Sequence, residues 1–186
     1  MDFTTMRAGF PGLTLRAALS AVVLVAACGH RDTGTGWQFK VDTTRSETDG
    51  SVRETAWLRV VGKERPAGAA ETKAVMLSFD CLPDHAISTI MTDQSLRQGS
   101  AEARLTVDAD SPRRIPGFAG TTPSGGQLVL TIPQVSILAL LSGHQRAVIE
   151  YVDGAGSSRT IAEFSIAGLE KYREPFLKVC TKTGAR

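Results

Sequence analysis

Apolar and polar residues alternate along several segments of the chain. The clearest case is 73–81, where Val75, Leu77, Phe79 and Cys81 share one face at a period of two. The same pattern in 101–110 sets Ala103, Leu105 and Val107 against polar neighbours and predicts a strand with one dry and one wet face. Further strands are expected at 37–44, 52–62, 86–93, 127–132, 145–152 and 159–166.

Two stretches interrupt this pattern. Residues 62–71 carry charges and Pro66 without periodicity and predict a charged loop. Residues 111–126 contain three of the eight prolines together with several glycines. They predict a loop that carries a short strand around Ile115 to Phe118.

Two segments have the pattern of helices. Residues 133–143 begin with Pro133 and end with Gly143, which suits a short helix packed on a sheet. Residues 167–180 place Leu169, Tyr172, Phe176 and Cys180 on one helical face. Because turns and short loops connect the strands, the predicted fold is a single antiparallel β-sandwich or partial barrel with a short helix and a C-terminal helix.

Composition is that of a globular protein of one domain, since 42% of the 186 residues are hydrophobic and 22% are charged. The net charge is +2, and without residues 1–27 there would be 19 basic and 18 acidic residues. Nucleic-acid binding depends on clustered Lys and Arg that neutralise phosphates. A nearly neutral chain gives no electrostatic reason to expect a nucleic-acid partner.

The N-terminus has the pattern of a targeting segment. Arg7 and Arg16 precede "AALSAVVLVAA", eleven apolar or small residues without a charge. A basic region followed by an apolar run of this length is typical of a signal peptide. It is too short to cross a bilayer as a permanent helix, which takes about 20 residues.

The end of this run, Val25-Ala26-Ala27-Cys28, resembles the lipobox of bacterial lipoproteins. The resemblance implies cleavage before Cys28, acylation of its thiol and of the new amine, and anchoring in the cell envelope facing the periplasm. Gly29 at the second mature position favours the outer over the inner membrane. Two other interpretations stay open: an ordinary cleavage site with an incidental Cys28, or Cys28 within a buried helix.

The lipoprotein interpretation divides the chain into four parts. Residues 1–27 form the signal peptide, 28–36 a polar, Gly-rich tether, 37–181 a β-rich globular domain and 182–186 a tail. The membrane, through the lipid anchor, is then one expected partner.

Three cysteines in an exported protein is an odd number. Lipidation of Cys28 leaves Cys81 and Cys180, which we expect to form a disulfide in an oxidising compartment. Both thiols lie on apolar faces, one of a strand and one of a helix. Two separate, inert thiols are an alternative, and so is a catalytic Cys81 near His85.

Several of these motifs together resemble the TagO/VasI-like family of exported proteins associated with type VI secretion. The matching positions are Trp37, Cys81, Arg104 with Asp108, Phe164, Gly168, Leu169 and Cys180, which together span about 37–181. The resemblance implies a periplasmic β-rich module with a disulfide. It supplies no catalytic residues.

Candidate chemistry is sparse. His30, His85 and His144 lie in the tether and in two turns, without the spacing of zinc ligands, and no cofactor or metal is expected. Arg104 and Asp108 form a candidate surface polar site, and Asp108 with Asp110 allows acid–base or calcium chemistry if the strand continues. Solvated acids beside a turn are the simpler interpretation.

These observations predict a membrane-anchored envelope lipoprotein without enzymatic activity. It would bind or scaffold an envelope protein and could be a type VI secretion accessory. Two alternatives remain: an inhibitor-type module comparable to small lysozyme-inhibiting lipoproteins, and a hydrolase whose site the sequence does not reveal.

Overall fold

The structure is a computed structural model that describes residues 36–45, 50–152 and 159–182. Over these residues the chain forms nine strands and two helices. They are β1 (Trp37–Arg45), β2 (Val52–Pro66), β3 (Lys73–Cys81), β4 (Ala86–Thr92), β5 (Gly99–Val107), β6 (Arg113–Thr122), β7 (Gly125–Leu130), α1 (Gln134–Leu141), β8 (Arg146–Val152), β9 (Arg159–Ser165) and α2 (Glu170–Lys182).

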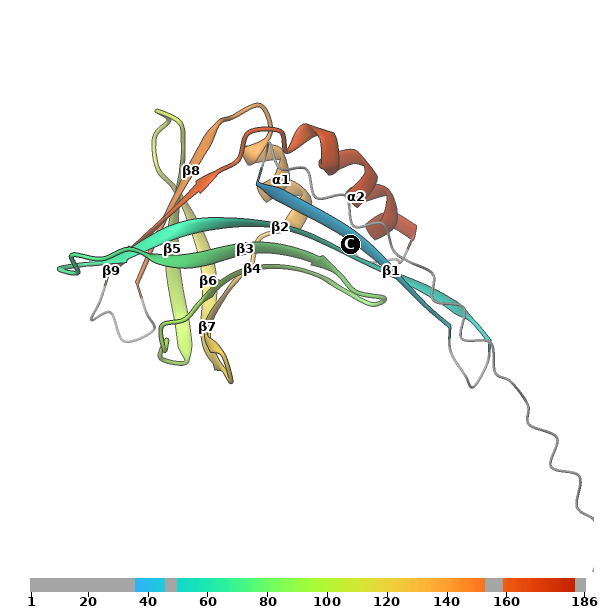
Figure 1. The fold of residues 1–186 in the computed structure, drawn as a ribbon, viewed down its shortest axis with the longest axis horizontal. Coiled ribbons are helices and arrows are strands. Elements are labelled where there is room, and N and C mark those ends of the chain that lie inside the picture. The colour runs from blue at the N-terminus through green and yellow to red at the C-terminus, as the bar shows by residue number, and fades with distance from the viewer. Residues whose placement is uncertain (1–35, 46–49, 153–158, 183–186) are drawn as a thin grey trace, which may run out of the picture.

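The strands form one antiparallel sheet in the order β1-β2-β3-β4-β7-β6-β5-β8-β9 (Figure 1). An additional pairing joins β9, the last strand of this order, to β2, the second, so the eight strands from β2 to β9 close into a barrel and β1 remains outside it. The predicted mainly β class with two helices is therefore confirmed. The sandwich alternative is wrong, because the sheet closes on itself instead of splitting into two layers.

Closure depends on the length of β2, which has 15 residues and serves two partners along one edge. Its first part pairs with β1 from Val52 to Val60, and its last part pairs with β9 from Lys63 to Pro66. The predicted loop at 62–71 is thus wrong in its first half. The predicted loop at 111–126 is also largely strand, since β6 and β7 form a hairpin there.

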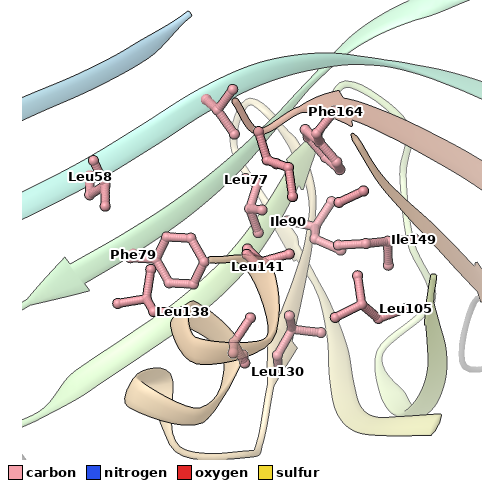
Figure 2. Packing of buried hydrophobic residues seen from close by; sticks show 14 of the residues in the cluster. Leu58, Leu77, Phe79, Ile90, Leu105, Leu130, Leu138, Leu141, Ile149 and Phe164 are labelled. Atoms are coloured by element: carbon pink, nitrogen blue, oxygen red, sulfur yellow. The ribbon is translucent and has the colours of Figure 1, made fainter. Parts of the chain in front are cut away.

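The inward faces of the strands fill the barrel with side chains. Figure 2 shows Leu77, Ile90, Leu105, Ile149 and Phe164 converging from five strands, all buried. Small barrels of eight strands have an interior that side chains can fill. Helix α1 covers one end, and its buried Leu138 and Leu141 belong to the same core as Phe79 and Leu77 (Figure 2).

Helix α2 packs on the part of the sheet that extends beyond the barrel, across β1 and β2 (Figure 1). Its Tyr172 and Phe176 are buried, and Phe39 of β1 contacts both rings at centroid distances of 6.4 and 6.3 Å. At the start of β1, Trp37 is fully buried and donates a hydrogen bond from Nε1 to the carbonyl oxygen of Ile166, at 3.1 Å. Neither helix in the described residues is long and apolar enough to span a membrane.

Candidate functional site

The outward face of β2, β3, β4, β7 and β6 carries seven apolar side chains among polar ones such as Arg59, Ser78 and Thr89. Neighbouring outward positions in the sheet include Val61, Met76 and Met91 in one row and Val129 with Phe118 in the next. Trp57 and Ile87 lie on either side of Asp80 in a third row. We call these seven residues the outer apolar surface: Trp57, Val61, Met76, Ile87, Met91, Phe118 and Val129.

This surface is open to solvent at its edges and hollowed near its first row. Val61 is 57% exposed and Phe118 is 44% exposed, while the other five are half-buried. A shallow hollow of about 240 Å³ lies between Val61, Met76 and Met91. A larger one of about 690 Å³ runs from Val61 along the β2–β9 junction to Ile161. Arg59, Ser78 and Thr89 lie between the rows, so the apolar side chains form a group interspersed with polar ones. Grouped exposed apolar side chains mark interaction sites more often than single ones do.

The charges beside the outer apolar surface are of both signs. Arg59, between Trp57 and Val61 on β2, donates to Ser78 Oγ and to Asp80 Oδ1, both at 3.0 Å. Its guanidinium also lies 4.5 Å from the centroid of the Trp57 ring, which fixes its position. Further along β2, Lys63 and Arg65 are exposed on the same outward face, and Glu163 of β9 lies opposite Lys63.

A second polar arrangement lies inside the barrel, around Glu64. This carboxylate is fully buried and accepts hydrogen bonds from the Thr92 hydroxyl, from Gln94 Nε2 at 2.6 Å and from the Tyr151 hydroxyl at 2.7 Å. The donors come from β4, from the turn after it and from β8. A buried carboxylate is tolerated only when such donors replace water.

The same arrangement holds Tyr151 in its neutral form. Burial raises the pKa of the Tyr151 phenol far above its ordinary value, and the hydrogen bond to Glu64 and the charge of that carboxylate raise it further. A protonated phenol can donate to the carboxylate, so each group stabilises the state of the other. Because Glu64 and Tyr151 are both buried, this cluster connects β2, β4 and β8 through hydrogen bonds inside the barrel.

The predicted pair Cys81 and Cys180 forms a disulfide, with the two Cα atoms 5.4 Å apart. It joins the end of β3 to the last turn of α2. Beside it, Gln134 at the start of α1 donates from Nε2 to the carbonyl oxygen of Ile87 at 2.9 Å. The disulfide thus attaches the end of α2 to the end of β3, beside the start of α1. A groove of about 750 Å³ runs past Cys180.

The structure gives Arg104 and Asp108 different partners. Arg104 is on the outer face of β5, and its Nε lies 3.6 Å from Oε1 of Glu102. The strand ends at Val107, so Asp108 does not continue it but adopts a positive φ of 48°. Its carboxylate accepts hydrogen bonds from His144 Nδ1 and the backbone N–H of Arg146, both at 2.9 Å. These contacts, the His144 bond first, lower the pKa of Asp108 and hold the turn before β8.

Other predicted residues fall into two groups. The lipidation site at Cys28 lies outside the described residues, as does the expected signal peptide. Most of the residues that carry the family resemblance are buried: Trp37, Cys81, Phe164, Leu169 and Cys180 all belong to the core. Gly168 has a φ of 80° in the turn before α2. In this chain those residues support packing and a turn.

Comparison with known proteins shows a similarity of fold to a solved structure. No family model matches the chain, and no curated protein does. The crystal structure of invasion associated protein B from Bartonella henselae is similar over 80% of this chain and 95% of that chain, with a TM-score of 0.50 and 11% sequence identity. At this identity the similarity concerns the fold alone.

Sequence reasoning missed both Glu64 and the outer apolar surface. Glu64 continues the inward series Ala56, Leu58, Val60 and Gly62 at a period of two, so the alternation was a usable signal. The outer apolar surface gave only short runs of consecutive apolar residues in each strand. Which of them would be neighbours depends on the pairing of five strands, and the sequence pattern does not specify it.

Proposed function

We propose that the protein is a membrane-anchored envelope lipoprotein that binds a protein partner and has no enzymatic activity of its own. The observation that carries this proposal is the outer apolar surface, seven apolar side chains that share the outward face of five strands with Arg59, Ser78 and Asp80. Water-facing strands of an antiparallel sheet are otherwise polar. Association with a partner removes such a surface from water.

The charges beside this surface also describe the partner. Lys63 and Arg65 are exposed next to Val61 with Glu163 opposite Lys63, and Arg59 is held over Trp57 and paired with Asp80. A complementary partner carries an apolar patch with charged groups of both signs at the rim that faces β2. Met76 and Met91 at the centre are flexible side chains that adapt to the shape of the partner.

The anchoring part of the proposal depends on the lipobox resemblance at Cys28. The finer assignment, an accessory of type VI secretion, depends on the motifs that end in Cys81 and Cys180. We propose it as the setting in which a partner is to be sought first.

A site-specific crosslinking experiment in intact envelopes tests the binding surface. A photoreactive amino acid at Val61 is expected to capture a discrete partner, and Val61→Asp combined with Phe118→Asp is expected to abolish co-purification of that partner. The matched control uses Val52, which is 63% exposed at the other end of β2. Equal capture from Val52 and Val61, or a partner retained by the double variant, would contradict the proposal.

A further inference from the structure

The side chain of Gln134 lies directly beside the disulfide of Cys81 and Cys180. Its amide oxygen is 3.5 Å from Sγ of Cys81 and 3.8 Å from Sγ of Cys180. The orientation of the amide is fixed, because Nε2 donates to the carbonyl oxygens of Ile87 at 2.9 Å and of Asp80 at 3.5 Å. A flipped amide would place an oxygen against these two carbonyl oxygens. Gln134 therefore directs an acceptor, and not a donor, at both sulfurs.

The amide oxygen of Gln134 has different partners in the two redox forms. A thiol has a hydrogen that it can donate, whereas the sulfur of a disulfide has none. In the part of the chain that the structure describes, the two cysteine sulfurs are the groups of the protein within hydrogen-bond distance of this oxygen. Gln134 is 7% exposed, so water has little access to replace a missing donor. The oxidised form thus leaves a largely buried acceptor without a protein donor, which costs free energy, and the reduced form supplies one.

The sulfur of Cys180 is the more accessible of the two. Cys81 is fully buried, whereas Cys180 is 5% exposed and lines the groove of about 750 Å³ together with Gln134. The walls of this groove are mainly apolar, and they include Leu177 of α2 and Ile87 of β4. Thiol–disulfide exchange requires that a thiolate reaches one of the two sulfurs. The groove provides that access at Cys180.

Helix α2 has contacts that do not depend on the disulfide. Its Tyr172 and Phe176 are buried, and Phe39 of β1 lies against both rings. The disulfide joins the last turn of the helix, where Lys182 Nζ also lies 3.6 Å from Glu54 as a partly exposed ion pair. An ion pair of this kind holds two elements together weakly. Opening of the disulfide is therefore expected to loosen the last turn and to leave the rest of α2 in place.

We propose that Cys81 and Cys180 form a reversible redox pair, which a dithiol reduces through the groove and whose reduced form Gln134 stabilises. A thiolate of the dithiol attacks Sγ of Cys180, the bond between the two cysteine sulfurs breaks, and Cys81 leaves as a thiolate that takes up a proton. The second thiolate of the dithiol then attacks its own sulfur in the mixed disulfide and releases Cys180, which takes up the second proton. The dithiol is oxidised to a disulfide, and its two electrons and two protons end on Cys81 and Cys180.

Gln134 distinguishes this pair from a purely structural disulfide. The bonds from its Nε2 are the same in both redox forms, so they favour neither. A crosslink that closes a long loop favours the oxidised form in the folded protein. The oxygen of Gln134 acts in the opposite direction, because it gains a hydrogen bond only when a thiol is present. This disulfide is therefore easier to reduce than the same crosslink beside an apolar side chain.

The test follows the oxidation state of the two cysteines in the purified, folded full chain, so it does not depend on the proposed binding of a partner. The protein is equilibrated with reduced thioredoxin, a dithiol protein, or with dithiothreitol, a small dithiol. Free thiols are then alkylated and located by peptide mass spectrometry. We expect Cys81 and Cys180 to become alkylated while the circular dichroism of the barrel is kept. Reduction by thioredoxin assigns the dithiol to a protein, and reduction by dithiothreitol alone assigns it to a small molecule. A pair that opens only in denaturant would overturn the inference.

A trapping experiment tests the site of attack. A thioredoxin variant without its second cysteine cannot complete the exchange, so it is expected to remain bound at Cys180. Amide hydrogen exchange after full reduction is expected to rise in 178–182 and to stay unchanged in 169–176. A mixed disulfide at Cys81, or loss of protection along the whole of α2, would contradict the proposed path.

Gln134→Leu removes the acceptor and keeps a side chain of similar size. It should shift the reduction equilibrium about threefold towards the disulfide, because one weak hydrogen bond from a thiol is lost. The bonds from Nε2 are lost in both redox forms and cancel in this ratio. Thr131→Val is the matched control, since Thr131 lines the same groove but donates to the carbonyl oxygen of Pro116. An unchanged equilibrium in Gln134→Leu, or an equal shift in Thr131→Val, would overturn the role of Gln134, and the trapping experiment needs neither variant.

Discussion

Glu64 is a single buried residue whose hydrogen bonds connect several strands of the barrel. It lies on the inward face of β2 and is fully buried, and the residues that the structure describes form no ion pair with it. Its charge is supported by hydroxyl and amide donors from β4, the turn after it and β8. Each donor that is removed leaves part of a buried carboxylate unsatisfied, which costs more than the loss of an ordinary hydrogen bond.

Tyr151→Phe removes one of these donors without a large change of shape. We expect the free energy of unfolding at pH 7 to fall by about 2 kcal/mol, the usual cost for a hydrogen bond to a charged group. Urea denaturation of the wild type and the variant measures this difference. In a Glu64→Gln background the same substitution should cost less, because the carboxylate that Tyr151 serves is gone. Equal costs in the two backgrounds would show that the hydroxyl acts elsewhere.

The raised pKa of Tyr151 also predicts how stability depends on pH. Unfolded tyrosine ionises near pH 10, whereas the folded phenol keeps its proton, so the unfolded state gains from alkali. The stabilisation is complete below about pH 10 and is lost progressively above it. Tyr151→Phe should therefore reduce the alkaline decline of the unfolding free energy by about 1.4 kcal/mol per pH unit. Denaturation midpoints of the wild type and the variant, measured from about pH 9 to about pH 11, would run in parallel if the prediction is wrong.

Sequence patterns predicted the burial of single residues where the alternation along one strand was enough to assign it. Cys81 follows Val75, Leu77 and Phe79 at a period of two, and it is fully buried as that period requires. Glu64 continues an equally regular series, but a charged residue among Lys63, Arg65 and Pro66 is typical of a loop. The donors that make its burial tolerable come from segments distant in sequence, so local patterns contain no trace of them.

At the scale of elements, the seam between β2 and β9 needs a residue without a side chain. A Cβ at Gly62 would lie 2.2 Å from the carbonyl oxygen of Glu163 and 2.6 Å from the Phe164 ring. The backbone of β9 therefore approaches β2 as closely as glycine allows. This contact lies at the point where β2 exchanges β1 for β9 as its partner.

Gly62→Ala should accordingly destabilise the barrel by about 2 kcal/mol, since overpacking of a tight contact has this order of cost. Gly120→Ala is the matched control, because a Cβ there meets nothing within 4 Å. Thermal unfolding followed by circular dichroism compares the two variants. A Gly62→Ala variant as stable as the Gly120→Ala variant would mean that the seam adjusts without strain.

The disulfide between Cys81 and Cys180 is a second feature that holds elements of the fold together. It joins residues 99 positions apart and attaches α2 to β3. Replacement of both cysteines by serine should lower the free energy of unfolding by about 4 kcal/mol, because the unfolded chain loses a long loop constraint. Denaturation with and without dithiothreitol measures it: the reductant should affect the wild type and leave the double variant unchanged. Free thiols at both positions in native protein would refute the pairing.

Element prediction succeeded where local pattern and local structure agree. The strand at 73–81, the helix at 134–141 and the hairpin of β8 and β9 lie within or near their predicted ranges. It failed for β6, which runs from Arg113 to Thr122 through Pro116 and Gly117. These residues disfavour a strand by propensity, but pairing with β5 and β7 on both sides overrides it.

At the scale of the whole molecule, closure of the barrel is the feature that sequence patterns could not supply. β2 and β9 are separated by about half the chain, and their pairing covers only four residue pairs. Alternation identifies which face of each strand is buried, and both a sandwich and a barrel satisfy it. The closed form follows from the length of β2 and the absence of a side chain at Gly62.

The position of β1 limits how far the folded domain lies from the proposed anchor. The expected tether, 28–36, leads directly into β1 at Trp37. Nine extended residues span at most about 30 Å, so the start of β1 would lie within that distance of the membrane surface. Partners of the β-rich domain are then to be sought close to the same membrane.

Anchoring itself is testable through Cys28→Ala. Three acyl chains exceed the two signals that stable membrane attachment needs, so the wild type should sediment with membranes and incorporate labelled palmitate. The variant should lose the label and either leave the membrane fraction or accumulate unprocessed. Cys81→Ser serves as the control, since it removes a thiol while it preserves the lipobox. Because the tether links the β-rich domain to the lipid in this proposal, unchanged palmitate labelling of Cys28→Ala would remove the anchor and, with it, the argument that partners of the domain lie near the membrane.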